Sequence, residues 1–137
     1  MKKINCILLI DDNSADNYYH EYILKDAGLC SHIKVAVNGI EALSYLKNSW
    51  QNAPSEEFPR PDILFLDINM PRMNGFEFLE EYMKLDDGLK CSTRVVMLTS
   101  SPDPDERNKA LAFKDVKEYH VKPLSIEMLH EIIERYF

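Results

Sequence analysis

Short apolar segments alternate with longer amphipathic segments along the whole chain. The apolar segments predict five buried strands, at residues 4–10, 33–37, 63–66, 94–98 and 118–121. The amphipathic segments predict five helices, at residues 14–27, 38 onward, 75–85, 105–113 and 126–136. Strands that alternate with helices form βαβ units around a parallel sheet, and near-continuous apolar strands are buried on both faces. The pattern therefore predicts an α/β fold with helices on both sides of a central sheet.

Local signals define the ends and the faces of these helices. Ser14 is expected to cap the first helix, and Gly28 suits the left-handed position that follows its end. Asn38-Gly39 opens the second helix. The apolar positions expected to face the sheet are Ile40, Leu43 and Leu46 in the second helix and Phe76, Leu79 and Met83 in the third.

Residues 48–61 form a connection that is longer than usual and contains three prolines. Connections of this length are often functional or mobile. Alternatively, the segment is an insertion whose aromatic residues, Trp50 and Phe58, fold back onto the core. The sequence leaves both interpretations open.

Charged residues follow three of the predicted strands at the point where each strand ends. Asp11 and Asp12 follow the first strand, Asp67 follows the third, and Lys122 follows the fifth. Right-handed crossovers favour a doubly wound sheet with the strand order 2-1-3-4-5, in which strands one and three are neighbours. The carboxyl ends of such strands form the ligand crevice of an open sheet. We therefore expect these four charged residues to converge on one site.

Clustered carboxylates need a compensating positive charge. Two carboxylates ~4 Å apart repel each other by about 4 kcal/mol at an effective dielectric constant near 20. Mg²⁺ prefers oxygen ligands and usually takes one or two protein carboxylates together with phosphate oxygens, a requirement that Asp12 and Asp67 suit. Taken alone, Asp11-Asp12 would equally fit a solvated turn after a strand. The sequence as a whole favours a magnesium site.

Asp67 also has the surroundings of a phosphoryl acceptor. A carboxylate held at the end of a strand and exposed by a turn can attack phosphorus and form an aspartyl phosphate. Lys122 and the hydroxyl of Thr99, which follows the fourth strand, could stabilise the phosphoryl oxygens. Pro123 follows Lys122 and fits an ordinary turn when considered alone, although its context suggests a cis peptide bond.

Composition limits the classes of protein to which the chain can belong. Its 137 residues, 45% of them hydrophobic, predict one domain over residues 1–137. A net charge of −7 and a pI near 5.1 argue against a nucleic-acid partner. No apolar run approaches the ~20 residues that span a membrane, and the first residues make a poor signal peptide. The three cysteines show no CxxC spacing, which favours reduced thiols in the cytoplasm. The four histidines lack ligand spacing and are expected to be ordinary surface or packing residues.

Several motifs in order resemble the receiver domain of two-component response regulators. The motifs are Ile10-Asp11-Asp12-Asn13, Phe65-Leu66-Asp67-Ile68-Asn69-Met70-Pro71 with Asn74-Gly75, Leu98-Thr99-Ser100 and Tyr119-His120-Val121-Lys122-Pro123. They span nearly the whole chain. The long connection before the third strand further resembles a group of stand-alone receivers that includes partners of phytochrome kinases. The resemblance implies a five-stranded, flavodoxin-like sheet.

The resemblance also assigns roles to individual residues. Asp67 would accept a phosphoryl group from a phosphohistidine on a sensor histidine kinase, and the chain would assist its own phosphorylation and dephosphorylation without being an enzyme in the usual sense. Asp11, Asp12, Asp67 and the backbone carbonyl of Asn69 would hold Mg²⁺. Thr99 and Lys122 would bind the phosphoryl oxygens, the Lys122-Pro123 bond would be cis, and Tyr119 would be the aromatic residue that turns inward with Thr99. Asn69 and Ser101 would gate the water that removes the phosphoryl group.

The resemblance leaves the output and the partners open. No segment follows the last predicted helix, so we expect output by protein contact, through the fourth helix, the fifth strand and the fifth helix. The partner could be a histidine phosphotransfer protein, a downstream target, or a second copy of the phosphorylated chain. The alternative function is a magnesium-dependent phosphatase of the haloacid dehalogenase type, which also uses an aspartate nucleophile. In such phosphatases a second aspartate acts as the general acid, and this chain has Asn69 at that position.

Overall fold

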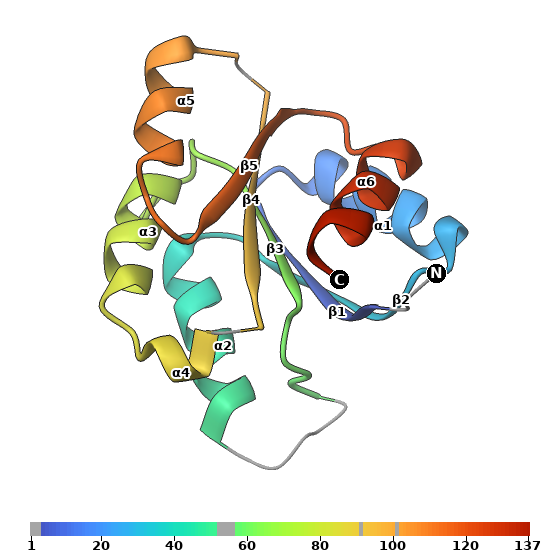
Figure 1. Cartoon of the computed structure of the whole chain (residues 1–137), viewed down its shortest axis with the longest axis horizontal. Helices are drawn as coiled ribbons and strands as arrows, with labels where there is room; N and C mark the ends of the chain where they lie inside the picture. Colours follow the sequence, from blue (N-terminus) through green and yellow to red (C-terminus); the bar gives the residue numbers. More distant parts are fainter. Residues whose placement is uncertain (1–3, 52–56, 91, 101) are drawn as a thin grey trace.

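Five parallel strands form the central layer of the computed structural model, which describes residues 4–51, 57–90, 92–100 and 102–137 (Figure 1). The strands are β1 (Ile4–Ile10), β2 (Cys30–Ala36), β3 (Ile63–Leu66), β4 (Arg94–Thr99) and β5 (Val116–Val121). Their order is β2-β1-β3-β4-β5, and each neighbouring pair is parallel. The predicted α/β fold and strand order are confirmed.

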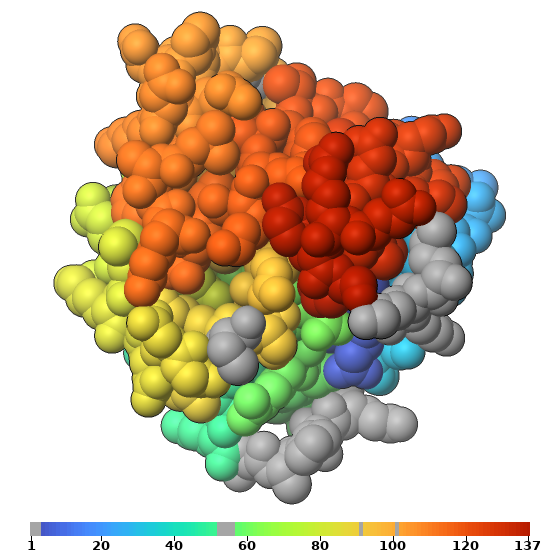
Figure 2. Space-filling model, in the orientation of Figure 1, coloured from blue at the N-terminus to red at the C-terminus, as the bar shows by residue number. Residues whose placement is uncertain are grey.

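Helices cover both faces of this sheet (Figure 1). One face carries α1 (Ser14–Ala27) and α6 (Ile126–Tyr136), and the other carries α2 (Gly39–Gln51), α3 (Gly75–Met83) and α5 (Pro104–Leu111). A single turn, α4 (Asp87–Lys90), precedes β4 and was not predicted, because four residues are too few to show a helical period. Among the described helices, none has the length and apolar character to cross a lipid bilayer. In the space-filling view, α5, β5 and α6 form a continuous surface (Figure 2).

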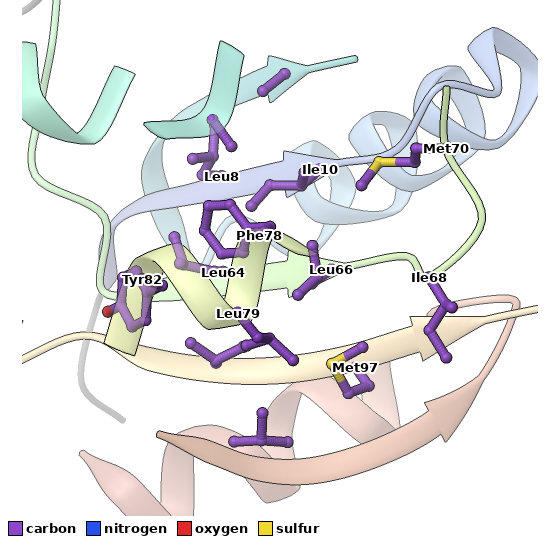
Figure 3. Packing of buried hydrophobic residues seen from close by; sticks show 14 of the residues in the cluster. Leu8, Ile10, Leu64, Leu66, Ile68, Met70, Phe78, Leu79, Tyr82 and Met97 are labelled. Carbon is purple, nitrogen blue, oxygen red and sulfur yellow. The ribbon is translucent and has the colours of Figure 1, made fainter. Parts of the chain in front are cut away.

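The sheet separates two apolar cores, because successive side chains of a strand point to opposite faces. In β1, Leu8 and Ile10 enter the core under α2 and α3, whereas Ile7 and Leu9 enter the core under α1 and α6. Figure 3 shows the first core, in which Phe78 lies above the strands. The strands are buried on both faces, so their near-continuous apolar sequence supplies side chains to both apolar cores.

Two of the residues expected to face the sheet are instead exposed. Ile40 is 44% exposed and Met83 is 41% exposed. The buried positions are Gly39, Ala42, Leu46 and Ser49 in α2 and Gly75, Phe78, Leu79 and Tyr82 in α3. With about 100° of rotation per residue, Ile40 and Met83 lie roughly a quarter turn or more from the centre of these faces. The three-residue spacing therefore placed the apolar stripe slightly off the true contact face.

The first helix begins one residue earlier than the cap assignment implied, because Ser14 is its first helical residue. Asn13, not Ser14, is the N-cap, and its side chain accepts a hydrogen bond from the Asp16 amide. Gly28 has the left-handed conformation that was predicted, with φ of 65°. The prediction of the helix span was right, and only the capping residue was wrong.

The aromatic residues of the long connection pack onto the rest of the molecule. Trp50 is the penultimate residue of α2 and packs, partly buried, against the first core. The Phe58 ring lies 5.7 Å from the Tyr45 ring, and the Tyr45 hydroxyl donates to the Pro59 carbonyl at 2.7 Å. The interpretation that these aromatic residues fold back is therefore confirmed for the described part of the connection. Residues 52–56 lie outside it.

Candidate functional site

The carboxyl ends of β1 and β3 bring three aspartates together. The Asp67 amide donates to the Ile10 carbonyl at 3.0 Å, so the residues that follow these two strands are neighbours. One carboxylate oxygen from each of Asp11, Asp12 and Asp67 lies within 4.8 Å of the other two. Asp11 and Asp67 are buried, whereas Asp12 is exposed. The predicted acidic cluster therefore exists and opens to solvent on the side of Asp12.

Lys122 reaches this cluster from the end of β5. Its Nζ atom lies 2.6 Å from Asp11 Oδ2, 2.9 Å from Asp16 Oδ2 and 3.3 Å from Asp67 Oδ2. The lysine side chain is 10% exposed, so these ion pairs are largely shielded from solvent. The predicted convergence of the lysine with the aspartates is confirmed.

Asp16 was not predicted as part of the site. It lies in the first turn of α1, which begins directly above the carboxyl end of β1. An acidic residue in a first turn is favourable for the helix dipole, so its position alone suggests no further partner for Asp16. The signal that could have found it is the four-residue spacing from Asp12, which places it one turn into the helix that leaves the site.

Burial and neighbouring charges shift the pKa values of the central pair. Burial, and then repulsion by Asp11, raise the pKa of Asp67 to about 6, against the lowering effects of Lys122 and the Ile68 amide. Burial alone would lower the pKa of Lys122, but hydrogen bonds to Asp11 and Asp16 and the charge of Asp67 outweigh it and raise that pKa. The lysine is therefore charged at neutral pH, and Asp67 is mostly ionised. The site then holds more negative than positive charge.

The loop after Asp67 is fixed by a close backbone contact. The Ile68 amide donates to Asp67 Oδ1 at 2.8 Å, and the Gly75 amide donates to the Ile68 carbonyl at 2.8 Å. A Cβ atom on Gly75 would overlap the Asp67 carbonyl oxygen and lie 2.9 Å from Ile68 Cα. Only glycine fits there, which gives Asn74-Gly75 a structural reason. Asn69 lies in this loop and is exposed.

Thr99 and Tyr119 lie on the adjacent strands β4 and β5. Thr99 is fully buried at the end of β4, and its carbonyl accepts the Lys122 amide at 2.8 Å. Tyr119 is half-buried on β5 and packs against the first core. Burial raises the pKa of Tyr119, against a hydrogen bond with the backbone of Asp103. Its ring also lines an open hollow of about 260 Å³ with Pro102, Asp103, Pro104, Arg107 and Val121.

The structure tests the predictions for the proline, histidine and cysteine residues only in part. The Lys122-Pro123 peptide bond is cis, as predicted. His20 is buried on α1, where its Nε2 atom accepts the Leu124 amide at 3.2 Å, a packing role that agrees with the expectation for the histidines. Cys6 and Cys30 are free thiols. Ser101 and Cys91 lie outside the described residues.

Comparison with known proteins gives similar structures over almost the full chain. A two-component response regulator from Cytophaga hutchinsonii matches with a TM-score of 0.87 and 29% identity, covering 98% of each chain. The bacteriophytochrome response regulator AtBRR matches with a TM-score of 0.77 and 29% identity, covering 98% of this chain and 93% of that one. The Mn²⁺-bound form of response regulator Rcp1 matches with a TM-score of 0.70 and 29% identity, covering 96% of this chain and 90% of that one.

Sequence relatives include both small and large signalling proteins. Response regulator Rcp1 of Synechocystis is 33% identical over 99 residues, which cover 72% of this chain and 65% of Rcp1. The chain also matches 3% of a hybrid signal transduction histidine kinase of Dictyostelium discoideum and 14% of the sensor histidine kinase CheAY of Helicobacter pylori. It therefore spans less than two thirds of each of these three relatives.

The family comparison agrees with the geometry of the site. Residues 7–134 match the family described as the response regulator receiver domain. Receiver domains work with histidine kinases in two-component signalling and are typically phosphoacceptors rather than enzymes. The acidic cluster of this chain lies where such a domain needs it, at the junction of β1 and β3. This chain belongs to the response regulator receiver family.

Proposed function

We propose that the chain is a phosphorylation-dependent signalling receiver whose acceptor is the carboxylate of Asp67. The observation that carries this proposal is the position of that carboxylate between two further aspartates and the ammonium group of Lys122. A group in that position has a nucleophilic oxygen, a positive charge beside it and an open side toward Asp12. These are the requirements for in-line attack on phosphorus.

The donor set fits a hard divalent cation. Asp11, Asp12 and Asp67 offer three carboxylate oxygens within reach of one ion, and the exposed Asn69 loop could add its backbone carbonyl. The Rcp1 relative was crystallised with Mn²⁺, and we propose Mg²⁺ as the cation for this chain. When bound, the cation supplies positive charge that offsets the charge of the phosphoryl oxygens.

The transfer step uses groups of this chain to hold and stabilise the phosphoryl group. An oxygen of Asp67 attacks the phosphorus of a phosphohistidine on a sensor histidine kinase. The new O–P bond forms as the P–N bond breaks, and the electron pair leaves with the histidine nitrogen. Lys122 and the Thr99 hydroxyl bind the phosphoryl oxygens. In a separate hydrolysis step, water attacks phosphorus and the bond between phosphorus and the Asp67 oxygen breaks, which regenerates the carboxylate and releases inorganic phosphate.

Binding of the phosphoryl group would shift the chain between two conformations. Thr99 would move toward the phosphoryl oxygens, and Tyr119 would fill the space behind it. Only a difference in affinity between the two conformations can bias their populations. The hollow beside Tyr119 and the surface of α5, β5 and α6 are where we expect the changed contacts with a target, a phosphotransfer protein or a second copy (Figure 2).

The phosphatase alternative has less support. A phosphatase of the haloacid dehalogenase type needs a second carboxyl group to protonate the leaving group. Asn69 occupies the corresponding position and carries an amide, which cannot act as that acid. Turnover of a small phosphomonoester that is abolished by Asp67→Asn would restore the phosphatase hypothesis.

The test of the proposed function is covalent modification of Asp67. Wild type incubated with acetyl phosphate and Mg²⁺ should gain one phosphoryl group by intact-mass measurement, and Asp67→Asn should gain none. Asp26→Asn is the matched control, because Asp26 is an exposed residue near the far end of α1. Equal incorporation into wild type and Asp67→Asn would overturn the assignment. A labelled wild-type chain that loses its phosphoryl group to a histidine phosphotransfer protein would identify it as a relay.

A further inference from the structure

The ammonium group of Lys122 has three carboxylate partners with different surroundings. Asp11 and Asp67 are buried members of the acidic triad, with side chains 7% and 8% exposed. Asp16 lies outside that triad, and its side chain is 36% exposed. The three partners come from the end of β1, the end of β3 and the first turn of α1. Asp16 is therefore the partner on the solvent side of the lysine.

Asp16 is held in place by the backbone of the site itself. Its amide donates to the Asn13 side chain at 3.0 Å, and the Asn13 amide donates to Asp11 Oδ1 at 2.9 Å. The helix that carries Asp16 lies beside α6, which follows the Lys122 segment (Figure 1). The distance between Asp16 and Lys122 is thus set by two short, hydrogen-bonded segments.

Asp11 would interact with two positively charged groups, Lys122 and the cation, once a cation is bound. Its Oδ2 atom lies 2.6 Å from Lys122 Nζ, and the same carboxylate belongs to the proposed cation site. An ammonium group and a divalent ion on one carboxylate repel each other. Cation binding therefore weakens the contact between the lysine and Asp11. The lysine then needs another acceptor near its present position.

We propose that Asp16 is a positioning residue that retains Lys122 when a divalent cation takes Asp11. The proposal rests on the proposed function, because it assumes the cation site. With Asp16 present, the lysine exchanges Asp11 for a partner that it already contacts, and it stays beside Asp67. Without Asp16, the lysine depends on the triad alone and competes with the cation for the same oxygens. Asp16 thereby favours cation binding through Lys122.

A simpler effect of Asp16 would also strengthen cation binding and must be distinguished from its action through Lys122. The negative charge of Asp16 also attracts a cation directly across the site, and this attraction does not need the lysine. A double-mutant cycle with Lys122→Met distinguishes the two, because only the proposed role disappears when the lysine is absent. Asp16→Asn keeps the size of the side chain, and Asp16→Glu keeps its charge.

The experiment measures Mn²⁺ affinity by isothermal titration calorimetry in metal-free buffer. We expect Asp16→Asn to weaken Mn²⁺ binding roughly fivefold, at the low end of usual coupling between two sites. The same substitution in the Lys122→Met background should change affinity by less than about twofold, and Asp16→Glu should restore most of the wild-type affinity. Asp26→Asn, which removes a charge roughly 15 Å along the same helix, should bind as wild type does.

The outcomes separate this inference from the proposed function. Equal weakening by Asp16→Asn in both backgrounds would show direct attraction alone and would overturn the positioning role. An unchanged affinity in Asp16→Asn would also overturn it while leaving the cation site intact. Failure of wild type to bind Mn²⁺ would remove the cation site and this inference with it. Thermal unfolding of Asp16→Asn without cation checks that the helix remains folded.

Discussion

Two lysines at opposite ends of the sheet have side chains largely shielded from solvent, and they have different partners. Lys90, in the turn before β4, is 4% exposed. Its Nζ atom lies 3.0 Å from the Tyr82 carbonyl, 3.1 Å from Asp115 and 3.5 Å from Asp87, and 4.8 Å from the centre of the Tyr82 ring. Lys122 contacts three carboxylates.

The difference separates a structural lysine from a functional one. Lys90 contacts two carboxylates, Asp115 and Asp87, but Asp87 also pairs with Lys114, so two ammonium groups balance two carboxylates. A backbone carbonyl and an aromatic face complete its surroundings, which connect α3, α4 and the residue before β5. Lys122 leaves its surroundings with excess negative charge, since three contacting carboxylates and Asp12 surround one ammonium group. A buried lysine therefore indicates a ligand site when its partners are carboxylates in excess.

The largest predicted effect comes from removing each lysine in turn. Lys90→Met should lower the free energy of unfolding by about 3 kcal/mol, because Asp115 and the Tyr82 carbonyl lose their partner in a buried position. Lys122→Met should cost about 1 to 2 kcal/mol in chelator, and saturating Mg²⁺ should recover most of that loss. Urea unfolding with and without Mg²⁺ measures both. If Mg²⁺ restored the stability of Lys90→Met, or did not restore that of Lys122→Met, the distinction between a structural and a functional lysine would be contradicted.

A smaller effect is expected from adding one methyl group at each end of the sheet. Gly75→Ala should cost about 2 kcal/mol, because its Cβ atom meets the backbone of Asp67 and Ile68, which must shift. Gly88→Ala is the matched control, since its Cβ atom meets only the Asp86 side chain, at 3.1 Å from Oδ1. Equilibrium unfolding compares the two. Equal stability of both variants would argue against a rigid backbone at the aspartate site.

The pH dependence of stability should show the smallest of these effects. The pKa of Asp67 is about 6 in the folded chain against an ordinary 3.8, so the folded chain binds the proton more tightly. This contribution is fully present below about pH 4 and is lost as pH rises through about 6, with a size on the order of 2 kcal/mol once solvent screening is taken into account. The difference in stability between wild type and Asp67→Asn, measured without divalent cation, should therefore fall across that range. A constant difference would show that the carboxyl group is not perturbed.

Those parts of the molecule that depend on local pattern could be predicted from the sequence. Each predicted strand overlaps an observed one, because burial on both faces requires nearly continuous apolar residues. Asp11, Asp67 and Lys122 could be placed because they directly follow such strands, and the strand order brings their ends together. The chemistry of this site could thus be predicted from the fold and from the types of residue at the carboxyl ends of the strands.

Features that arise from tertiary contact could not be predicted in the same way. Asp16 and Lys122 are 106 residues apart, and the four-residue spacing of Asp16 from Asp12 places Asp16 near the site without indicating its partner. Lys90 lies in a polar stretch, Leu85-Asp86-Asp87-Gly88-Leu89-Lys90, that suggests a solvated loop. Its burial depends on the Tyr82 ring and on Asp115, which lies 25 residues further along the chain.

The hydrogen bond between His20 and the Leu124 amide has a mechanical consequence for the site. It fastens the middle of α1 to the backbone two residues after Lys122. The helix that carries Asp16 and the segment that carries Lys122 are therefore coupled by the His20 side chain as well as by the ion pair. When the end of β5 moves, we expect α1 to move with it as a rigid unit. The solvent-facing surface of α1 would then change position when the aspartate site changes.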